Sequence, residues 1–369
     1  MPTRLATIDI GTNTAQLLVV EKTGRELRRV GDAERFVRLG EGVDAAGRIG
    51  SNAQERLLTA LHQHVEAARA WGAERVVAAG TSALRDAANR TAVCRRIRQD
   101  LGVTVDILSG DEEATWSFAA ACSPFGDLDG DAVVVDVGGG STELIAGHEP
   151  AAADPTAAIR HRVSLDVGCI RLTERCLDGQ PPSTAAVTEA ERVIDAALAS
   201  AGRPPAPDAT LIGTAGTATA LALVDAGPDS TAGLLRGEND PATPTRIPTR
   251  NPIRSGRTGG VLSRRTVRRW RDQLLQQPVD AIRALHPNAM DGRADVFPVG
   301  VMLLDRVMAH VGADRLHVSP RELRYGLAMR AVRHPSSEAE SRASGSAFGS
   351  ASGSGARPPE AAAGPQEEQ

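Results

Sequence analysis

Short apolar runs alternate with helical stretches along most of this chain of 369 residues. The runs 4–10, 74–80 and 131–137 are rich in Val, Ile, Leu and Ala and lie next to glycine, which is typical of buried strands. Helical stretches are expected at 51–71 and 111–121, after the strands that precede them. This alternation of strands and helices predicts an α/β fold.

The same reading gives a full set of elements. Strands are expected at 4–10, 15–21, 74–80, 103–110, 131–137 and 141–147, helices at 51–71, 81–90, 111–121, 263–275 and 318–331, and a strand, turn and helix within 209–224. Ser263 is expected to cap the helix at 263–275, and Ser319 with Glu322 is expected to form a capping box at the start of the last helix. A break at Ser123 and Pro124 divides the chain into a first domain, 1–123, and a second domain, 124–318.

Two segments are not expected to form ordered structure of their own. Residues 228–260 are rich in Pro, Gly, Thr and Arg and lack periodicity, so they are expected to form a flexible insertion. Residues 335–369 are mostly Ser, Ala, Gly, Glu and Pro, and such a tail buries too little apolar surface to become ordered.

The amino-acid composition limits which catalytic and anion-binding groups the protein can use. Lys22 is the sole lysine, so Schiff-base chemistry and a phosphate-loop lysine are nearly excluded, and any anion clamp must use arginine. The formal net charge of −4 does not by itself indicate a nucleic-acid or membrane partner. The four cysteines lack C-x-x-C spacing, and no apolar run reaches membrane-spanning length, so a soluble cytoplasmic protein is expected.

One motif occurs twice. The stretch "DIGTNTAQL" at 9–17 aligns with "DVGGGSTEL" at 136–144, so that Asp9 falls on Asp136 and Gly11 on Gly138. Each copy lies between two apolar runs and therefore predicts a β-hairpin with a tip of glycine and hydroxyl residues. A single copy could be an ordinary tight turn, but two copies at matched spacing indicate a duplicated domain whose two tips face each other across a cleft.

The residue types in the tips suit phosphate. Glycine lets an anion approach the backbone, successive N–H groups form a nest for it, and hydroxyls add donors. The candidate phosphate-binding residues are Gly11, Thr12, Asn13, Thr14, Gly138, Gly139, Gly140, Ser141 and Thr142, and a third Gly/Thr loop offers Gly213, Thr214, Gly216 and Thr217. Asp9 and Asp136, which end the first strand of each hairpin, suit a hard cation such as Mg²⁺.

Arginine is concentrated late in the chain. Between 241 and 271 there are nine arginines and no acidic residue, namely Arg246, Arg250, Arg254, Arg257, Arg264, Arg265, Arg268, Arg269 and Arg271. This segment either gathers a long polyanion through counterion release or is a solvated surface of a protein that uses arginine for nearly every positive charge.

Several motifs together carry a family resemblance. They are "IDIGTNTAQLLV", "TSALRDAAN", "ILSGDEEA", "VVDVGGGSTELI", "VSLDVGCIRLTE", "GTAGTATALA" and "RADVFPVGVMLL", in this order. The chain resembles the exopolyphosphatase and guanosine pentaphosphate phosphohydrolase (Ppx/GppA) family, within the larger group of sugar kinases, heat-shock ATPases and actin. The resemblance implies two ribonuclease H-like domains of the actin-like ATPase fold, an active site in the cleft between them, and a C-terminal helix, 319–334, that returns to the first domain.

The resemblance also assigns roles. Glu113 matches the glutamate that activates the attacking water, whereas its neighbour Glu112 fits a Ser-x-x-Glu capping box that begins at Ser109. Glu113 could otherwise be a solvated acid at a helix start. Arg85 is expected in about the first turn of a helix, where its charge opposes the helix dipole. It matches an arginine that contacts substrate phosphate, with a structural ion pair, for example with Asp86 or Asp111, as the alternative. Glu143, across the hairpin from Asp136, joins it in the metal region, and Gln16 is its neutral counterpart in the first copy.

The implied function is release of terminal orthophosphate from inorganic polyphosphate, assisted by Mg²⁺ or another divalent cation. Guanosine pentaphosphate is the alternative substrate, because both molecules end in a phosphoanhydride. A sensor that binds such a ligand without hydrolysis is the other class considered, and the intact Asp136, Glu143 and Glu113 argue against it. A sugar or acetate kinase of the same fold group would need an acceptor site, for which the chain shows no signature. No membrane partner is expected, and a homodimer is common in the family.

Overall fold

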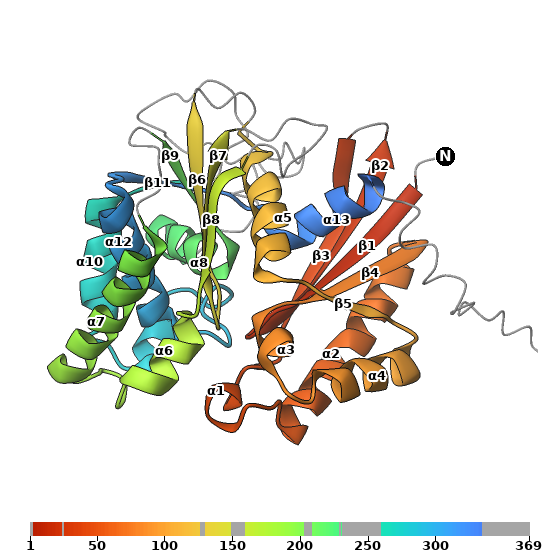
Figure 1. The fold of residues 1–369 in the computed structure, drawn as a ribbon, viewed down its shortest axis with the longest axis horizontal. Coiled ribbons are helices and arrows are strands. Elements are labelled where there is room, and N and C mark those ends of the chain that lie inside the picture. The colour runs from red at the N-terminus through yellow and green to blue at the C-terminus, as the bar shows by residue number, and fades with distance from the viewer. Residues whose placement is uncertain are drawn as a thin grey trace, which may run out of the picture.

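The computed structural model describes residues 3–23, 26–125, 130–148, 159–202, 209–228, 230 and 260–333. Two lobes, each built on its own sheet, lie side by side (Figure 1). The elements are β1 (Thr3–Ile10), β2 (Thr14–Thr23), β3 (Glu26–Phe36), α1 (Val43–Ala46), α2 (Ser51–Ala70), β4 (Arg75–Gly80), α3 (Ser82–Asp86), α4 (Arg90–Leu101), β5 (Val105–Ile107), α5 (Gly110–Cys122), β6 (Asp131–Val137), β7 (Thr142–His148), β8 (Ile159–Leu165), α6 (Cys169–Cys176), α7 (Thr184–Ala201), β9 (Thr210–Thr214), α8 (Ala215–Ala226), β10 (Val261–Ser263), α10 (Arg264–Leu274), α11 (Val279–Ala284), α12 (Phe297–Val311), β11 (Arg315–Val318) and α13 (Leu323–Arg333).

The first sheet has the strand order β3-β2-β1-β4-β5. Strands β1, β2 and β3 form an antiparallel meander, and β4 and β5 run parallel to β1. The sequence did not predict β3, because its stretch "ELRRVGDAERF" is dominated by charge. Its position at the edge of the sheet explains how so polar a strand is tolerated.

The second sheet repeats this plan, with the order β10-β11-β9-β6-β7-β8. Strand β6 pairs antiparallel with β7 and parallel with β9, as β1 pairs with β2 and β4. The next parallel strand is β5 in the first sheet and β11 in the second. The predicted duplication therefore holds for whole lobes and not only for two hairpins.

The repeat continues into the helices that follow these last strands. The Leu108 N–H donates to the Gly80 carbonyl at 3.0 Å just before α5, and the Ser319 N–H donates to the Gly213 carbonyl at 2.8 Å just before α13. Helices α5 and α13 are thus equivalent elements. They pack against each other between the two sheets (Figure 1).

Helices α5 and α13 join the two lobes through apolar contacts. Phe118 of α5 packs in one cluster with Val134 and Ile212 of the second sheet. Leu327 and Ala328 of α13 lie in clusters with residues of the first sheet. The closing helix therefore returns to the first lobe, as the sequence resemblance implied.

Two of the three predicted helix caps are confirmed. Ser109 and Glu112 form the capping box of α5, and the Ser263 hydroxyl accepts from the Thr266 N–H at the start of α10. The predicted capping box of Ser319 and Glu322 is wrong. The Ser319 N–H already donates to the Gly213 carbonyl, α13 begins only at Leu323, and the Glu322 side chain points elsewhere.

The described residues do not test the predicted insertion, the predicted tail or the predicted domain limits. Nearly all of the predicted insertion, 228–260, and the predicted tail, 335–369, lie outside the described residues. The domain limits at 123 and 318 stay predictions, because strand pairing does not show where a unit folds independently. Within the described residues, no helix combines the length and the apolar character needed to cross a membrane.

The contact between α13 and α5 gives a first test. A Cβ added at Gly326 would lie 2.3 Å from the Trp116 carbonyl oxygen, so Gly326→Ala must push the two helices apart. We expect it to lower the free energy of unfolding by about 1–3 kcal/mol, measured by chemical denaturation. Gly179→Ala, at an exposed position where the nearest atom would be 3.9 Å away, is the control and should be nearly neutral. Equal stability of both variants would contradict the packing described for these two helices.

Candidate active site

A cavity of about 110 Å³ lies between the lobes, where the hairpin tips meet. Both hairpins, the starts of α5, α8 and α12 and the segment before α13 contribute to it. Its lining residues are Asp9, Gly11, Thr12, Asn13, Thr14, Gln16, Glu34, Thr81, Ser82, Glu113, Asp136, Val137, Gly138, Gly139, Gly140, Ser141, Glu143, Cys169, Ala215, Gly216, Thr217, Arg293, Val296, Phe297, Glu322 and Leu323.

The two hairpin tips approach within van der Waals distance of each other. A Cβ built on Gly139 would lie 3.0 Å from Thr12 Cβ, and one built on Gly140 would lie 3.0 Å from the Thr12 hydroxyl. Side chains at 139 and 140 would therefore separate the tips, which is why glycine is required there. The predicted meeting of the tips across a cleft is confirmed.

The two tips are built alike. The Gly11 N–H donates to the Thr14 carbonyl at 2.9 Å, and the Gly138 N–H donates to the Ser141 carbonyl at 3.0 Å. Most of the predicted phosphate-binding residues of the tips line the cavity. Thr142 does not: it is buried within the second lobe, and its hydroxyl donates to the Val167 carbonyl.

The register of each hairpin places the acidic side chains. Asp136 pairs directly with Glu143, as predicted, and Asp9 pairs with Gln16 at the same position of the first hairpin. The Glu143 carboxylate accepts a hydrogen bond from the Ser164 hydroxyl at 2.8 Å. Asp9 Oδ1 is shut off from solvent and has no hydrogen-bond partner among the described residues.

Burial and mutual repulsion disfavour the charged forms of these acids. Burial raises the pKa of Asp9 well above its ordinary value, and the charges of Glu113 and Glu322 raise it further. The pKa of Asp136 is raised well above its ordinary value by burial and then by Glu322 and Glu113. Burial likewise raises the pKa of Glu143, with smaller contributions from Glu113 and Asp136. The acids of the cavity thus repel one another, and each is disfavoured in its charged form.

Glu113 enters the cavity from the start of α5. Its carboxylate accepts a hydrogen bond from the Arg85 guanidinium at 2.9 Å, and Arg85 also donates to the Leu108 carbonyl at 3.2 Å. Burial raises the pKa of Glu113, whereas its pair with Arg85 lowers it. Arg85 is not among the residues that line the cavity.

Two expectations about Arg85 are wrong in detail. Helix α3 ends at Asp86, so Arg85 lies in its last turn and does not oppose the helix dipole. The alternative ion pairs with Asp86 or Asp111 are not formed either. Asp86 contacts Arg171, and Asp111 contacts Arg162, so that the partner of Arg85 is Glu113.

Half of the predicted third loop reaches the cavity. Gly216 and Thr217 line it, whereas Gly213 and Thr214 lie behind, with the Thr214 hydroxyl donating to the Arg321 carbonyl. The loop holds a non-glycine residue, Ala215, at a φ of 60°, in the left-handed region that disfavours side chains.

The first lobe has a matching loop that the sequence analysis missed. The end of β4 reads Gly80-Thr81-Ser82, as the end of β9 reads Gly213-Thr214-Ala215, and Thr81 and Thr214 each precede a helix. Thr81 and Ser82 line the cavity. The repeated Gly-Thr after an apolar strand was the available signal.

Other residues reach the cavity through tertiary contacts alone. Arg293, before α12, donates to Glu34 of β3 at 2.7 Å and lies over the Phe36 ring at 5.1 Å. Beside it, Arg38 forms a two-point ion pair with Asp295. These pairs connect the two lobes at one side of the cavity. Arg293 and Asp295 belong to the motif "RADVFPVGVMLL", but the sequence analysis gave neither of them a role.

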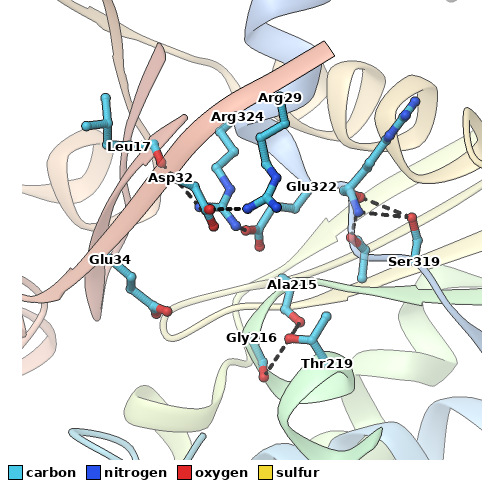
Figure 2. Close-up of polar contacts among 12 residues, drawn as sticks. Leu17, Arg29, Asp32, Glu34, Ala215, Gly216, Thr219, Ser319, Glu322 and Arg324 are labelled. Carbon is cyan, nitrogen blue, oxygen red and sulfur yellow. Dashed lines mark hydrogen bonds and ion pairs between the residues drawn. The ribbon is translucent and has the colours of Figure 1, made fainter. Parts of the chain in front are cut away.

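Glu322 is the least expected member of the site. It precedes α13, and its carboxylate forms an ion pair with Arg324 at 2.8 Å while lining the cavity. Figure 2 shows Glu322 and Arg324 directed toward each other, with Asp32 on the far side of Arg324. Burial raises the pKa of Glu322, and Arg324 lowers it.

The described part of the arginine-rich segment, from 260 to 271, does not line the cavity. Arg246, Arg250, Arg254 and Arg257 lie outside the described residues, and α10 contributes no lining residue. Arg264 and Arg271 contact Asp305, and Arg269 contacts Asp225. Much of the charge of α10 is therefore used within its own lobe, and the predicted gathering of a polyanion stays a prediction.

The carboxylate oxygens that line the cavity suit a hard cation. Six of the lining residues are acidic, Asp9, Glu34, Glu113, Asp136, Glu143 and Glu322, and one, Arg293, is basic. Within the described part of the chain, no three acids, cysteines or histidines converge as a ready-made metal cage. Oxygen donors that hold a cation jointly with substrate phosphates are the arrangement Mg²⁺ usually takes.

Relatives of this chain have the same organisation. Exopolyphosphatase 2 of Mycobacterium tuberculosis is 34% identical over 345 residues, which cover 89% of this chain and 98% of that protein. A guanosine-5'-triphosphate,3'-diphosphate pyrophosphatase of Vibrio cholerae is 34% identical over 170 residues, 46% of this chain and 33% of that one. The solved structure of an exopolyphosphatase-like protein superposes with a TM-score of 0.75 at 28% identity and covers 89% of this chain and 97% of that one.

The similarity extends across both lobes and the cavity between them. The expected actin-like arrangement of two related α/β domains is thereby confirmed. The model of the Ppx/GppA phosphatase family matches residues 18–334. This chain belongs to the Ppx/GppA phosphatase family.

Proposed function

We propose that the protein releases orthophosphate from the end of inorganic polyphosphate. The observation that carries the proposal is the cavity between two glycine-tipped hairpins, because residues of both tips line the same small space. A terminal phosphate and its neighbour are held there by N–H groups and hydroxyls of both tips. The similarity to an exopolyphosphatase over nearly the full chain supports this choice of substrate.

A divalent cation is part of the proposal, and the residues fit it. Asp9 Oδ1 has no partner among the described residues, and burial and mutual repulsion raise the pKa of Asp136 and Glu143, as expected of carboxylates that share a cation. Asp136, Glu143 and Asp9 would hold Mg²⁺, or another divalent ion of similar chemistry. When bound, it neutralises charge on the phosphates and the transferred group.

Glu113 has the position expected of a general base. It lies at the cavity wall, close enough to the hairpin acids for its charge to raise their pKa values, and its own raised pKa favours accepting a proton from an attacking water. Arg85 holds the carboxylate in one orientation at 2.9 Å. We infer that Arg85 positions Glu113 and stabilises negative charge as water attacks in line with the leaving phosphate.

Guanosine pentaphosphate is the second candidate substrate. The Vibrio cholerae relative supports it, although the match there covers less than half of this chain. Phosphate release from long polyphosphate, guanosine pentaphosphate and ATP, each with and without Mg²⁺, separates the candidates. We expect the highest kcat/KM with polyphosphate; no release from any of the three would contradict the proposed function. Dimerisation and a cytoplasmic location stay predictions from the sequence.

Replacing the proposed base gives the sharpest test of mechanism. Glu113→Gln keeps the size of the side chain but cannot accept the proton, so turnover should fall by about 10²–10⁴-fold while polyphosphate still binds. Phosphate release and calorimetric binding measure the two effects.

The neighbouring acid provides a matched control. Glu112→Gln removes a carboxylate one residue away on the same helix that only caps α5, and because glutamine can serve in the same capping box, it should leave the turnover of the folded protein unchanged. Near-normal turnover in Glu113→Gln would show that another group activates the water.

The proposed cation site makes a prediction about stability. Folding raises the pKa of Asp136, so the cation-free protein loses stability as pH rises from the ordinary carboxyl range toward that raised value. Without cation, Asp136→Asn should therefore unfold at or above the wild-type temperature at neutral pH. With Mg²⁺ at about a hundred times its dissociation constant, the wild type should gain about 2.7 kcal/mol and the variant much less.

Thermal unfolding with EDTA or Mg²⁺ measures this difference. The Glu112→Gln variant, whose altered side chain lies outside the cavity, should gain as much from Mg²⁺ as the wild type. An Asp136→Asn protein that is less stable without cation, yet gains as much from Mg²⁺ as the wild type, would contradict the assignment.

A further inference from the structure

The two lobes bring equivalent helix starts to the same cavity. Strand β5 leads through Ser109 to the acids of α5, and β11 leads through Ser319 to Glu322 before α13. Both stretches read Ser-x-x-Glu and occupy the same place in the repeated plan. In the first copy Glu112 caps its helix and Glu113 faces the cavity, whereas in the second copy the Ser-x-x-Glu acid itself faces the cavity.

A local hydrogen bond explains why the Glu322 carboxylate does not cap its helix. A capping glutamate would bond to the N–H of its serine, but the Ser319 N–H donates to the Gly213 carbonyl at 2.8 Å. The Ser319 hydroxyl accepts from the Arg321 N–H instead. The Glu322 carboxylate is therefore not used for capping, and 8% of the residue's surface remains exposed, on the cavity side.

Glu322 also fills a gap in the pattern of acids. In the second hairpin Asp136 has Glu143 opposite it, but in the first hairpin Asp9 faces the neutral Gln16. Glu322 lies close enough to Asp9 and Asp136 for its charge to raise the pKa of both. Asp9 Oδ1, buried and without a partner, points to a ligand still to be supplied on this side.

Arg324 does not cancel this charge. Its guanidinium is shared between Glu322 at 2.8 Å and Asp32 at 3.7 Å, and it also donates to the Leu17 carbonyl (Figure 2). With six acids and one arginine on the cavity wall, a phosphate chain entering without cations meets strong repulsion.

We propose that Glu322 is a further residue of the cation-holding set, which works with Asp9 and makes polyphosphate binding depend on a divalent cation. This inference rests on the proposed function. An acid at this position, in the same cavity as Asp136 and Glu143, attracts the cation before substrate arrives and repels substrate that arrives without one.

The test measures binding rather than turnover. An imido-linked polyphosphate, which resists hydrolysis, is titrated into each variant by calorimetry, once in EDTA and once with saturating Mg²⁺. In Glu322→Gln the lost repulsion should tighten binding in EDTA several-fold, and the gain on adding Mg²⁺ should shrink by about tenfold, the usual size of one neighbouring charge. Glu322→Asp keeps the charge and should keep most of the wild-type gain.

Asp32→Asn is the matched control. It removes the other acid beside Arg324 without changing the cavity wall, so its binding should follow the wild type in both buffers. A merely structural role for Glu322 would weaken binding in both buffers in parallel, and that result, or an unchanged Mg²⁺ gain in Glu322→Gln, overturns the inference. If the wild type binds the analogue in neither buffer, the proposed function and this inference both fail, whereas the other failures leave the proposed function standing.

Discussion

Repulsion among carboxylates in a closed cleft is the constraint on which the rest of this structure depends. Asp9, Asp136 and Glu143 are removed from water at the ends of buried strands, and Glu113 joins them from α5. Such a cluster disfavours folding on its own, because each acid loses hydration and faces others of the same charge. Its presence in an otherwise well-packed protein is explained if cation and phosphate complete the site.

Apolar packing and ion pairs between the lobes offset the free-energy cost of burying these acids. Apolar clusters anchor α5 and α13 between the two sheets, and ion pairs such as Arg293 with Glu34 and Arg38 with Asp295 connect the lobes beside the cavity. Glycines at 139 and 140 let the tips meet, since any side chain would meet Thr12 or Ser82. The lobes therefore approach closely enough for two sets of backbone donors to act on one ligand, and the charge of the acids is concentrated in the same place.

The sequence predicted the parts of the site that depend on local geometry. The position of Glu143 opposite Asp136 follows from hairpin register, and the cap at Ser109 follows from a motif four residues long. Residues brought in by tertiary contacts were missed. Arg293 reaches the cavity beside its partner Glu34, which lies on a strand too polar to be predicted from the sequence. Glu322 was wrongly assigned to a capping box because the Ser319 N–H donates to a carbonyl 106 residues earlier, at Gly213.

The central claim is that both hairpin tips hold the same phosphoryl groups, with a cation among the acids. A crystal structure of the protein with Mg²⁺ and an imido-linked polyphosphate tests it most directly. The account predicts terminal phosphate oxygens within hydrogen-bond distance of backbone N–H groups from both 11–14 and 138–141, and Mg²⁺ bound by phosphate and carboxylate oxygens. An analogue held by one tip alone, or bound on α10 and outside the cleft, would contradict the account.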